Sequence, residues 1–528
     1  MTHPHSDSLL GLLDRKADGN PGVEAFHFAG RGSWTWRAFR HEVDNLARAM
    51  GHALPTPGAP VLIALPNSPE FLFALFAVYR TGGIPAPLFP GGSSLRLNRL
   101  AARCGAAGIV IPDSRKPVPG ETAGLRSGLR LQRPPFENNA SSGMPSVLPD
   151  ANKTALVQFT SGSTGQPSAV PISHSALATN IRQMSEAWNL THRDSFVNWL
   201  PLYHDMGLIL MTLTPLVLGS PPVLMQTGLK RIRRWFRLVR EHKGTITAAP
   251  DFAYRFALTY VHPRQHGDLS SLRIAVNAAE PVRLSTIKRF EKTFAIAGAM
   301  RPAYGLAEAT AGVCCVRPGV PIHTDGAGNV SVGRPFPGIR IRTRDTEHRD
   351  CKEIQVNTPA ATRGYIGFPE SPRGLFTPDG WLRTGDRGFM DSRGELYVLG
   401  RLRHTLRQEG RTLGVREVEE LMESLNFVRR CAAAGIDPGG IDGERIVIFL
   451  EFRNTRLQAA RCRDLIAIAV KEFHDYFGFR PGRVVPLRPR GIPLTVNGKI
   501  RYSELATRFL SGDLDSINPF PDHPATSG

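Results

Sequence analysis

Two hydrophobic periods alternate along most of the chain. Short apolar runs predict strands at residues 60–65, 84–89 and 108–111. Helical periodicity lies before and between them, at residues 8–53, 68–80 and 95–102, with a strand-to-helix transition at 33–37. Strands that alternate with helices favour a largely parallel α/β sheet.

The pattern changes twice further along the chain. Residues 116–149 are dominated by proline, glycine, serine and asparagine, which predicts an exposed, mobile connection. From 320 to 390 helical patterns are scarce, and short strands are predicted at 339–343, 353–357 and 364–367. A strand at 396–399 and a hinge at 400–403 follow, and then a second alternation with a helix at 416–425, a strand at 445–452 and a helix at 457–477.

These patterns together predict an α/β fold in two domains. The large N-terminal domain, residues 1–401, consists of α/β subdomains and a small β-rich subdomain. A small, mobile α+β C-terminal domain is expected at 402–515, and residues 516–528 are expected to form a disordered tail.

The composition is that of a globular protein with a basic surface. The chain has 528 residues, 41% of them hydrophobic and 21% charged, and a net charge of +19. Such a charge is compatible with nucleic acid, an anionic membrane or an acidic protein as partner. The densest basic cluster, residues 230–237, alternates with apolar residues and predicts one amphipathic helix. We therefore favour dispersed, solvated charge, and we expect no nucleic acid partner.

Cysteine usage and hydropathy bear on the compartment. None of the six cysteines forms a Cys-x-x-Cys pair or has zinc-ligand spacing with histidines, so free thiols in a reducing compartment are expected. Residues 1–7 lack an apolar signal core. The longest apolar run, 71–79, is too short to span a bilayer. We expect a cytoplasmic protein with no membrane insertion.

A hydroxyl-rich glycine loop is the first candidate for chemistry. A short strand at 155–159 runs into six residues that are all Gly, Ser or Thr: Thr160, Ser161, Gly162, Ser163, Thr164 and Gly165. Small side chains let backbone N–H groups close around an anion, and the hydroxyls add donors. A helix is expected after Pro171, with Ser173 as N-cap, so the arrangement is typical of phosphate binding. The alternative is a flexible turn.

Further motifs follow in a fixed order along the chain. They lie at residues 199–208 (WLPLYHDMGL), 277–281 (NAAEP), 304–310 (YGLAEAT), 384–386 (TGD) with 400–401 (GR), and 493–501 (PLTVNGKIR). With these motifs the chain resembles the adenylate-forming superfamily, which includes acyl-CoA synthetases, fatty acyl-AMP ligases, luciferases and nonribosomal adenylation domains. The motifs at 199–208 and 304–310 are most similar to those of fatty acyl-AMP ligases.

The resemblance implies a two-step reaction. A carboxylic, most simply fatty, acid attacks the α-phosphate of ATP to give an acyl-adenylate and pyrophosphate, with Mg²⁺ on the phosphates. The acyl group then passes to the phosphopantetheine thiol of an acyl carrier protein, in polyketide, lipid or nonribosomal peptide biosynthesis. Two anions must approach each other in the first step, so the site must neutralise developing charge.

The resemblance also implies residue roles in the nucleotide site. Thr160 and the rest of the glycine loop would hold the β- and γ-phosphates, and Glu308 would bind Mg²⁺. Tyr304, followed by Gly305, would stack on adenine, next to a turn that carries Ala279 and Glu280. The family usually has a lysine and a glycine where Ser168 and Ala169 stand here, so one positive charge on the phosphates is missing.

The remaining implied roles concern the ribose, the acyl site and the hinge. Asp386 would accept both ribose hydroxyls, Arg401 would reach the ribose or phosphate, and Arg403 would be the hinge. His204 would lie beside the acyl site, and Lys499 would bridge the attacking carboxylate and the α-phosphate. Thr160, His204 and Lys499 are the implied catalytic residues. Each has a structural alternative, such as a core tyrosine or a surface lysine.

Three alternatives to the carrier-dependent ligase remain at this level. The ligases that use carrier proteins have an insertion before the Thr-Gly-Asp turn, and the short stretch from 365 to 384 lacks it, so coenzyme A stays open as acceptor. Ser168 is compatible with a non-enzymatic adenylate-binding protein that has a decayed site. A nucleic-acid-binding protein rests on net charge alone.

Overall fold

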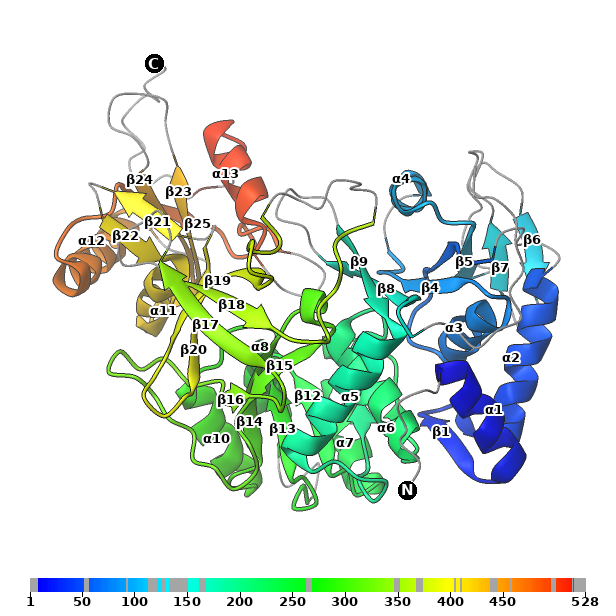
Figure 1. The fold of residues 1–528 in the computed structure, drawn as a ribbon. Coiled ribbons are helices and arrows are strands. Elements are labelled where there is room, and N and C mark those ends of the chain that lie inside the picture. The colour runs from blue at the N-terminus through cyan, green and yellow to red at the C-terminus, as the bar shows by residue number, and fades with distance from the viewer. Residues whose placement is uncertain are drawn as a thin grey trace. The chain divides into compact units, whose positions relative to one another are not determined.

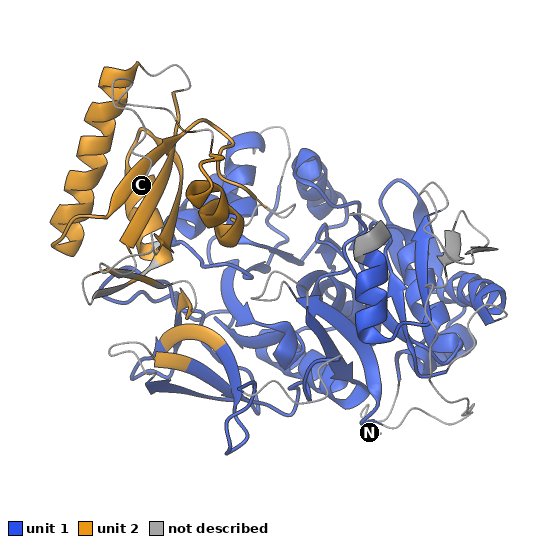
Figure 2. Cartoon of the chain, turned by 90° about the horizontal axis from the view of Figure 1, so that it is seen from above, with its two compact units in different colours: residues 1–346, 354–384, 389–398 blue, residues 347–353, 385–388, 399–528 orange. Residues whose placement is uncertain are grey.

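The protein is represented by a computed structural model with two compact units. The model describes residues 8–51, 57–91, 94–112, 122–125, 129–132, 151–160, 168–262, 268–345, 352–366, 374–402, 405–408, 411–436, 445–454, 458–494, 500–514 and 516. Unit 1 comprises Met1–Thr346, Ile354–Thr384 and Phe389–Val398, and unit 2 comprises Glu347–Glu353, Gly385–Gly388 and Leu399–Gly528 (Figure 2).

The N-terminal part of unit 1 contains the predicted parallel strands. β3 (Pro60–Ile63) pairs in parallel with both β4 (Ile84–Pro87) and β5 (Gly108–Pro112). The predicted helices between them are α3 (Pro69–Arg80) and α4 (Ser94–Cys104). Nine of the twelve residues of α3 are buried, which explains its continuous apolar run.

The expectation of a mobile connection is wrong for two segments. β6 (Thr122–Leu125) and β7 (Leu129–Gln132) pair antiparallel and extend the sheet to the order β4-β3-β5-β7-β6 (Figure 1). An edge strand needs only one hydrogen-bonded neighbour, so a polar, glycine-containing sequence can still add to a sheet. The rest of the predicted connection lies outside the described residues.

The first 51 residues hold the predicted strand-to-helix transition at 33–37 and one further strand that periodicity did not reveal. The helices α1 (Leu9–Gly19) and α2 (Trp36–Gly51) flank β1 (Glu24–Phe28) and β2 (Gly32–Thr35). β1 joins β10 (Val197–Asn198) and β11 (Val223–Leu224) in a four-stranded sheet of order β10-β11-β1-β2. Pairing with strands far along the chain therefore decided the structure of this segment.

The glycine loop connects two strands. β8 (Thr154–Thr160) and β9 (Ser168–Ser173) pair antiparallel, with Thr160 opposite Ser168. The helix α5 (His174–Trp188) begins only after β9, and the Ser173 side chain accepts a hydrogen bond from Ala176 N at 3.1 Å. The predicted helix after Pro171 and its N-cap are confirmed, whereas β9, which lies between the loop and the helix, was not predicted.

A parallel sheet forms the centre of unit 1. β12 (Ile246–Ala249), β13 (Ile274–Asn277) and β14 (Met300–Gly305) are parallel, and β15 (Gly312–Cys315) and β16 (Arg334–Pro335) complete it. The helices α7 (Ile232–Glu241), α8 (Asp251–Tyr260) and α10 (Leu284–Phe294) precede or separate the parallel strands. Ligands bind beyond the carboxyl ends of such strands, where β13 and β14 place residues 277–281 and 304–310.

A four-stranded sheet in the second half of the chain agrees in part with the predicted β-rich region. Its order is β17 (Arg340–Asp345), β18 (Lys352–Asn357), β19 (Leu382–Met390) and β20 (Leu396–Arg401), and the described residues between 320 and 390 include no helix. The strand predicted at 364–367 is wrong within the described residues, because Ile366 forms only an isolated bridge with Ala169.

Unit 2 has its own core. β24 (Arg445–Phe452) lies between β23 (Val428–Ile436) and β25 (Arg483–Leu487), with helices α11 (Val415–Ser424), α12 (Ala459–Phe477) and α13 (Tyr502–Leu510). A hairpin of β21 (Thr405–Gln408) and β22 (Arg411–Gly414) precedes α11. The predicted helix–strand–helix alternation is therefore confirmed.

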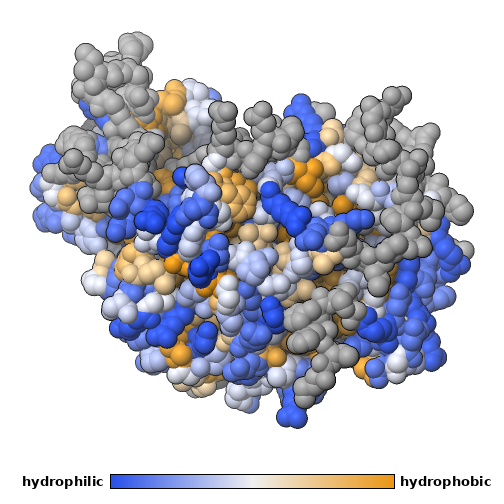
Figure 3. All heavy atoms as spheres, viewed as in Figure 1, coloured by the Kyte–Doolittle hydropathy of each residue, from blue (hydrophilic) through white to orange (hydrophobic). Residues whose placement is uncertain are grey.

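Surface hydropathy is mixed. On the face shown in Figure 3, hydrophilic and hydrophobic residues are interspersed. Among the described residues, no helix combines the length and the apolar character that crossing a bilayer requires.

Candidate active site

The turn after β13 is held in a strained conformation from two sides. Ala279 has φ +67°, a region that residues with a side chain seldom adopt. The buried carboxylate of Asp251 accepts hydrogen bonds from Asn277 Nδ2 at 3.0 Å, from Arg283 N at 3.2 Å and from Thr286 Oγ1 at 3.1 Å. These contacts fix the backbone of the turn before any ligand binds.

Glu280 has a structural partner in the same turn. Its Oε1 accepts a hydrogen bond from Phe252 N, which belongs to the first turn of α8. A carboxylate at a helix N-terminus is stabilised by the unpaired N–H groups there. The side chain of Glu280 thus ties the turn to α8, and its contact with a nucleotide stays a prediction.

Tyr304 and Gly305 end β14 at the same edge of the sheet. Tyr304 is partly buried and packs against the main core. A Cβ at Gly305 would lie 1.8 Å from the carbonyl oxygen of Ala311. The glycine of this motif is therefore required by the close approach of two backbone segments.

Glu308 lies on a short 3-10 helix, η4 (Ala307–Ala309), and is held at both ends. Its carbonyl oxygen accepts from Thr362 N at 2.8 Å. Its Oε1 accepts from the hydroxyl of Tyr365, also at 2.8 Å. A single oriented carboxylate with free acceptor capacity fits Mg²⁺, which keeps several water and phosphate ligands. Sequence reasoning missed Tyr365, because no spacing links residue 365 to residue 308.

The base of the glycine loop lies in the same region of unit 1. Ile366 N donates to Ala169 O at 2.9 Å, and Thr362 Oγ1 donates to Pro171 O at 2.7 Å. The segment that holds Glu308 is thus bonded to β9, and both β8 and β9 contact η4. Thr160 is half-buried at the end of β8, whereas Ser161, Gly162, Ser163, Thr164 and Gly165 lie outside the described residues.

His204 lies at the start of an unusual helix. The π-helix η2 (Met206–Leu213) is entirely buried, and π-helices are frequent at functional sites. His204 Nδ1 lies 2.6 Å from Asp205 Oδ1, and the same oxygen accepts from Met206 N at 2.6 Å. Asp205 orients the imidazole, and the imidazole remains accessible because 36% of its surface is exposed.

The Thr-Gly-Asp motif lies within β19, so the turn expected there is wrong, and its aspartate is held by an ion pair. Gly385 has φ +68° and accepts a hydrogen bond from Leu402 N at 2.8 Å. Asp386 Oδ1 lies 2.9 Å from Arg401 Nε, and the aspartate side chain is 7% exposed against 56% for the arginine. This pair orients a buried carboxylate, which could accept hydrogen bonds from two ribose hydroxyls.

The positions of Lys499 and Arg403 are outside the described residues. The segment around Lys499 is flanked by a bridge between Leu494 and Ile500 and by a hydrogen bond from Arg501 N to Pro493 O of 2.9 Å. Their catalytic and hinge roles stay predictions.

A nucleophilic cysteine is disfavoured by burial. Burial raises the pKa of both Cys314 and Cys315, so these thiols stay protonated at neutral pH. Thiolate chemistry at these two positions is not expected.

Comparison with known proteins identifies the family. The model of the AMP-binding enzyme family matches residues 13–366. The chain belongs to the AMP-binding enzyme family. A relative in this family is the long-chain-fatty-acid–AMP ligase FadD26 of Mycobacterium marinum, 28% identical over 97% of this chain and 98% of the relative.

A second relative agrees with the chain in length, and a solved structure agrees with it in fold. The medium-chain-fatty-acid–[acyl-carrier-protein] ligase JamA of Moorena producens is 27% identical, covering 98% of this chain and 97% of the relative. A solved structure from a study of fatty acyl-adenylate ligases of E. coli and L. pneumophila has a TM-score of 0.79 at 23% identity, and covers 96% of this chain and 99% of that chain. The adenylate-forming fold predicted from the motifs is confirmed.

Proposed function

We propose that this AMP-binding enzyme activates a fatty or related carboxylic acid with ATP. The products of the first step are an acyl-adenylate and pyrophosphate. The proposal rests chiefly on Glu308: its carboxylate is held by Tyr365, and the segment of Tyr365 is bonded through Thr362 to the hairpin that carries the glycine loop. A carboxylate beside a phosphate-binding loop suits nucleotide chemistry that needs a metal ion.

Each residue then has a defined task in the first step. Glu308 would hold Mg²⁺, which neutralises phosphate charge when bound. The glycine loop from Thr160 to Gly165 binds the β- and γ-phosphates, and Tyr304 stacks on adenine next to Ala279. Asp386 accepts the ribose hydroxyls, with Arg401 beside it. Lys499 stabilises the charge that develops between the acid and the α-phosphate.

We propose that His204 borders the acyl site. A half-exposed imidazole held by Asp205 can close one side of an acyl channel without losing its own orientation. In the second step a phosphopantetheine thiol attacks the adenylate carbonyl, which forms the thioester and releases AMP. Movement about Arg403 would withdraw Lys499 and admit that thiol.

The acceptor is the finer part of the proposal. JamA is named for transfer to an acyl carrier protein, and we propose the same class of acceptor here. Coenzyme A is the alternative, because the insertion expected before residue 384 is absent. Purified enzyme should be offered both thiols side by side with a panel of acids. Thioester on coenzyme A alone would decide for the alternative.

One experiment tests the proposal as a whole. Carboxylate-dependent exchange of labelled pyrophosphate into ATP is expected with at least one acid of medium or long chain. Nucleotide binding without exchange, for every acid tried, would instead support a non-catalytic adenylate-binding protein, the alternative that Ser168 allows.

The cysteines bear on the cellular compartment. Those that the structure describes are free and buried. We therefore propose a reducing, cytoplasmic setting.

A further inference from the structure

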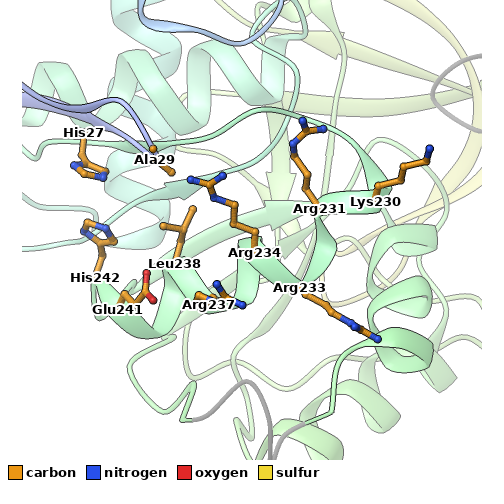
Figure 4. Close-up of a pocket in the computed structure, with 11 residues that line it drawn as sticks. His27, Ala29, Lys230, Arg231, Arg233, Arg234, Arg237, Leu238, Glu241 and His242 are labelled. Atoms are coloured by element: carbon orange, nitrogen blue, oxygen red, sulfur yellow. The ribbon is translucent and has the colours of Figure 1, made fainter.

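A basic cavity lies apart from the residues assigned to the nucleotide and acyl sites. It has a volume of about 470 Å³ and lies in unit 1, between α7 and the end of β1 (Figure 4). Its lining residues are His27, Ala29, Gly30, Lys230, Arg231, Arg233, Arg234, Arg237, Leu238, Glu241 and His242. A cavity of this size accommodates a small ligand or a headgroup.

The cations of this cavity have few polar partners among the residues that the structure describes. Five of the lining residues are lysine or arginine, and Glu241 is the one carboxylate among them. Arg233 Nε donates to the neutral carbonyl of Tyr260 at 3.0 Å. The other four cations make no hydrogen bond or ion pair with the residues that the structure describes. Such an excess of positive charge favours an anion.

Two arginines elsewhere in unit 1 have carboxylate partners. Arg80 bonds Asp14 at 2.8 Å, and Arg273 bonds Asp194 at 2.7 Å through two nitrogens. The five cations of the cavity lack such carboxylate partners within the described residues. The excess of positive charge is therefore specific to this cavity.

The helix α7, which carries Arg233, Arg234 and Arg237, is held in place by its buried face. Trp235 is fully buried, its Nε1 donates to Thr247 Oγ1 at 2.8 Å, and its ring stacks on Trp199 at 4.8 Å. The arginines on the opposite face are thus presented from a fixed backbone, and Figure 4 shows Arg231 and Arg234 pointing to the same side of the helix. Binding an anion would need little reorganisation.

The charge arrangement is unfavourable for the free helix. The first turn of α7 has no acidic residue and contains Arg233 and Arg234, although the dipole favours anions at that end. Within α7, Arg233 and Arg237 stand four residues apart. Like charges at this spacing repel. A bound anion would relieve both effects.

The other wall leaves room for the Arg234 guanidinium. Gly30 has φ +83°, and a Cβ there would come 2.8 Å from Arg234 Nη2. Close by, the rings of His27 and His242 lie 4.8 Å apart. The wall therefore combines a glycine that approaches the arginine with two potential imidazole donors.

We propose that this cavity binds a multivalent phosphate group, either of a free oligophosphate or of an anionic phospholipid headgroup. Guanidinium groups bind phosphate oxygens in a bidentate manner, and several of them on one rigid helix match an anion with more than one charge. The proposal is independent of the ligase activity.

The test compares charge-neutral variants of the full-length protein. Arg234→Gln/Arg237→Gln removes two cavity cations, and Lys288→Gln/Arg289→Gln removes two exposed cations from α10 as a matched control. Inorganic tripolyphosphate is titrated by calorimetry with ATP present at saturation. Vesicles of phosphatidylcholine with and without phosphatidic acid, whose phosphomonoester can carry two charges, are tested by sedimentation.

The expected result is a loss of about tenfold or more in affinity for one anionic probe in the cavity variant only. Loss for tripolyphosphate identifies a free oligophosphate, and loss for the vesicles with phosphatidic acid identifies a headgroup. Arg231→Gln serves as a second, milder variant if the double variant unfolds. Equal loss in the α10 control, or no binding of either probe by the native protein, overturns the proposal.

Discussion

The hydroxyl of Tyr365 donates a 2.8 Å hydrogen bond to Oε1 of Glu308. The two residues are 57 positions apart in the sequence. A hydrogen bond to a carboxylate fixes its rotamer and leaves its second oxygen for another ligand. We infer that Tyr365 is a positioning residue for the proposed metal ligand.

Replacement of Tyr365 should therefore lower the affinity for Mg²⁺ more than it lowers the stability of the protein. For Tyr365→Phe we expect the Mg²⁺ concentration for half-maximal pyrophosphate exchange to rise about tenfold, since a hydrogen bond to a charged group contributes roughly 1.5–3 kcal/mol. Tyr260→Phe, at a tyrosine that is 45% exposed, is the control. An unchanged Mg²⁺ dependence in Tyr365→Phe would refute the positioning role.

Gly305→Ala should disrupt the end of β14. The added Cβ would lie 1.8 Å from Ala311 O, so the two backbone segments must separate. We expect a loss of at least about 1–3 kcal/mol in the free energy of unfolding, together with loss of ATP binding. Urea unfolding and ATP titration measure the two effects. Gly326→Ala, where no atom lies within 4 Å of the new Cβ, should behave like the native protein.

Removal of the Asp386 carboxylate should abolish the preference for a nucleotide that has both ribose hydroxyls. Two hydrogen bonds to a carboxylate contribute at least about 3 kcal/mol, so Asp386→Ala should lower kcat/KM for ATP about 100-fold or more. The same variant should change little with 2′,3′-dideoxy-ATP, which lacks both hydroxyls. An equal loss with both nucleotides would argue against a ribose contact. Asp513→Ala, at an exposed carboxylate of unit 2, is the control.

Lys499→Ala should separate the two half-reactions. A cation that acts only in the first transition state is dispensable afterwards. We expect pyrophosphate exchange to fall about 100-fold or more, and thioester formation from preformed acyl-adenylate to fall far less. Lys471→Ala, at an exposed lysine on α12, should affect neither step. Equal loss of both steps in a folded Lys499→Ala protein would contradict the proposed role.

Asp194 should contribute a pH-dependent part of the stability. Burial raises the pKa of its carboxyl, but the hydrogen bonds from Arg273, Thr191 and Thr245 outweigh burial and hold the pKa below its ordinary value. Its stabilisation is therefore complete above the unfolded pKa of about 3.9 and is lost as pH falls through the lower, folded pKa.

Asp194→Asn should remove this contribution. Its free energy of unfolding, measured with urea at a series of pH values, should be lower than that of the native protein near neutrality and should fall less in acid. The exposed Asp18, whose side chain is 69% accessible, provides the control Asp18→Asn with a small effect. A native-like acid response in Asp194→Asn would show that other groups govern this range.

The sequence by itself determined many of the elements and the family. Continuous apolar runs identified α3, β3 and β24, because an element that is buried on most sides is apolar along most of its length. The motifs with Gly305 and Gly385 were also recognisable, since backbone approach or positive φ restricts those positions. The family match confirms the resemblance inferred from these motifs.

Only the tertiary structure decided how distant segments pair. β6 shows no apolar alternation and β7 alternates over only four residues, so neither was predicted; they form strands by pairing beside β5. The contact of Tyr365 with Glu308 and that of Glu280 with Phe252 join residues without a common period. Hydrogen bonds and edge pairing depend on where the chain returns in space, and local hydrophobic spacing records only which face each element buries.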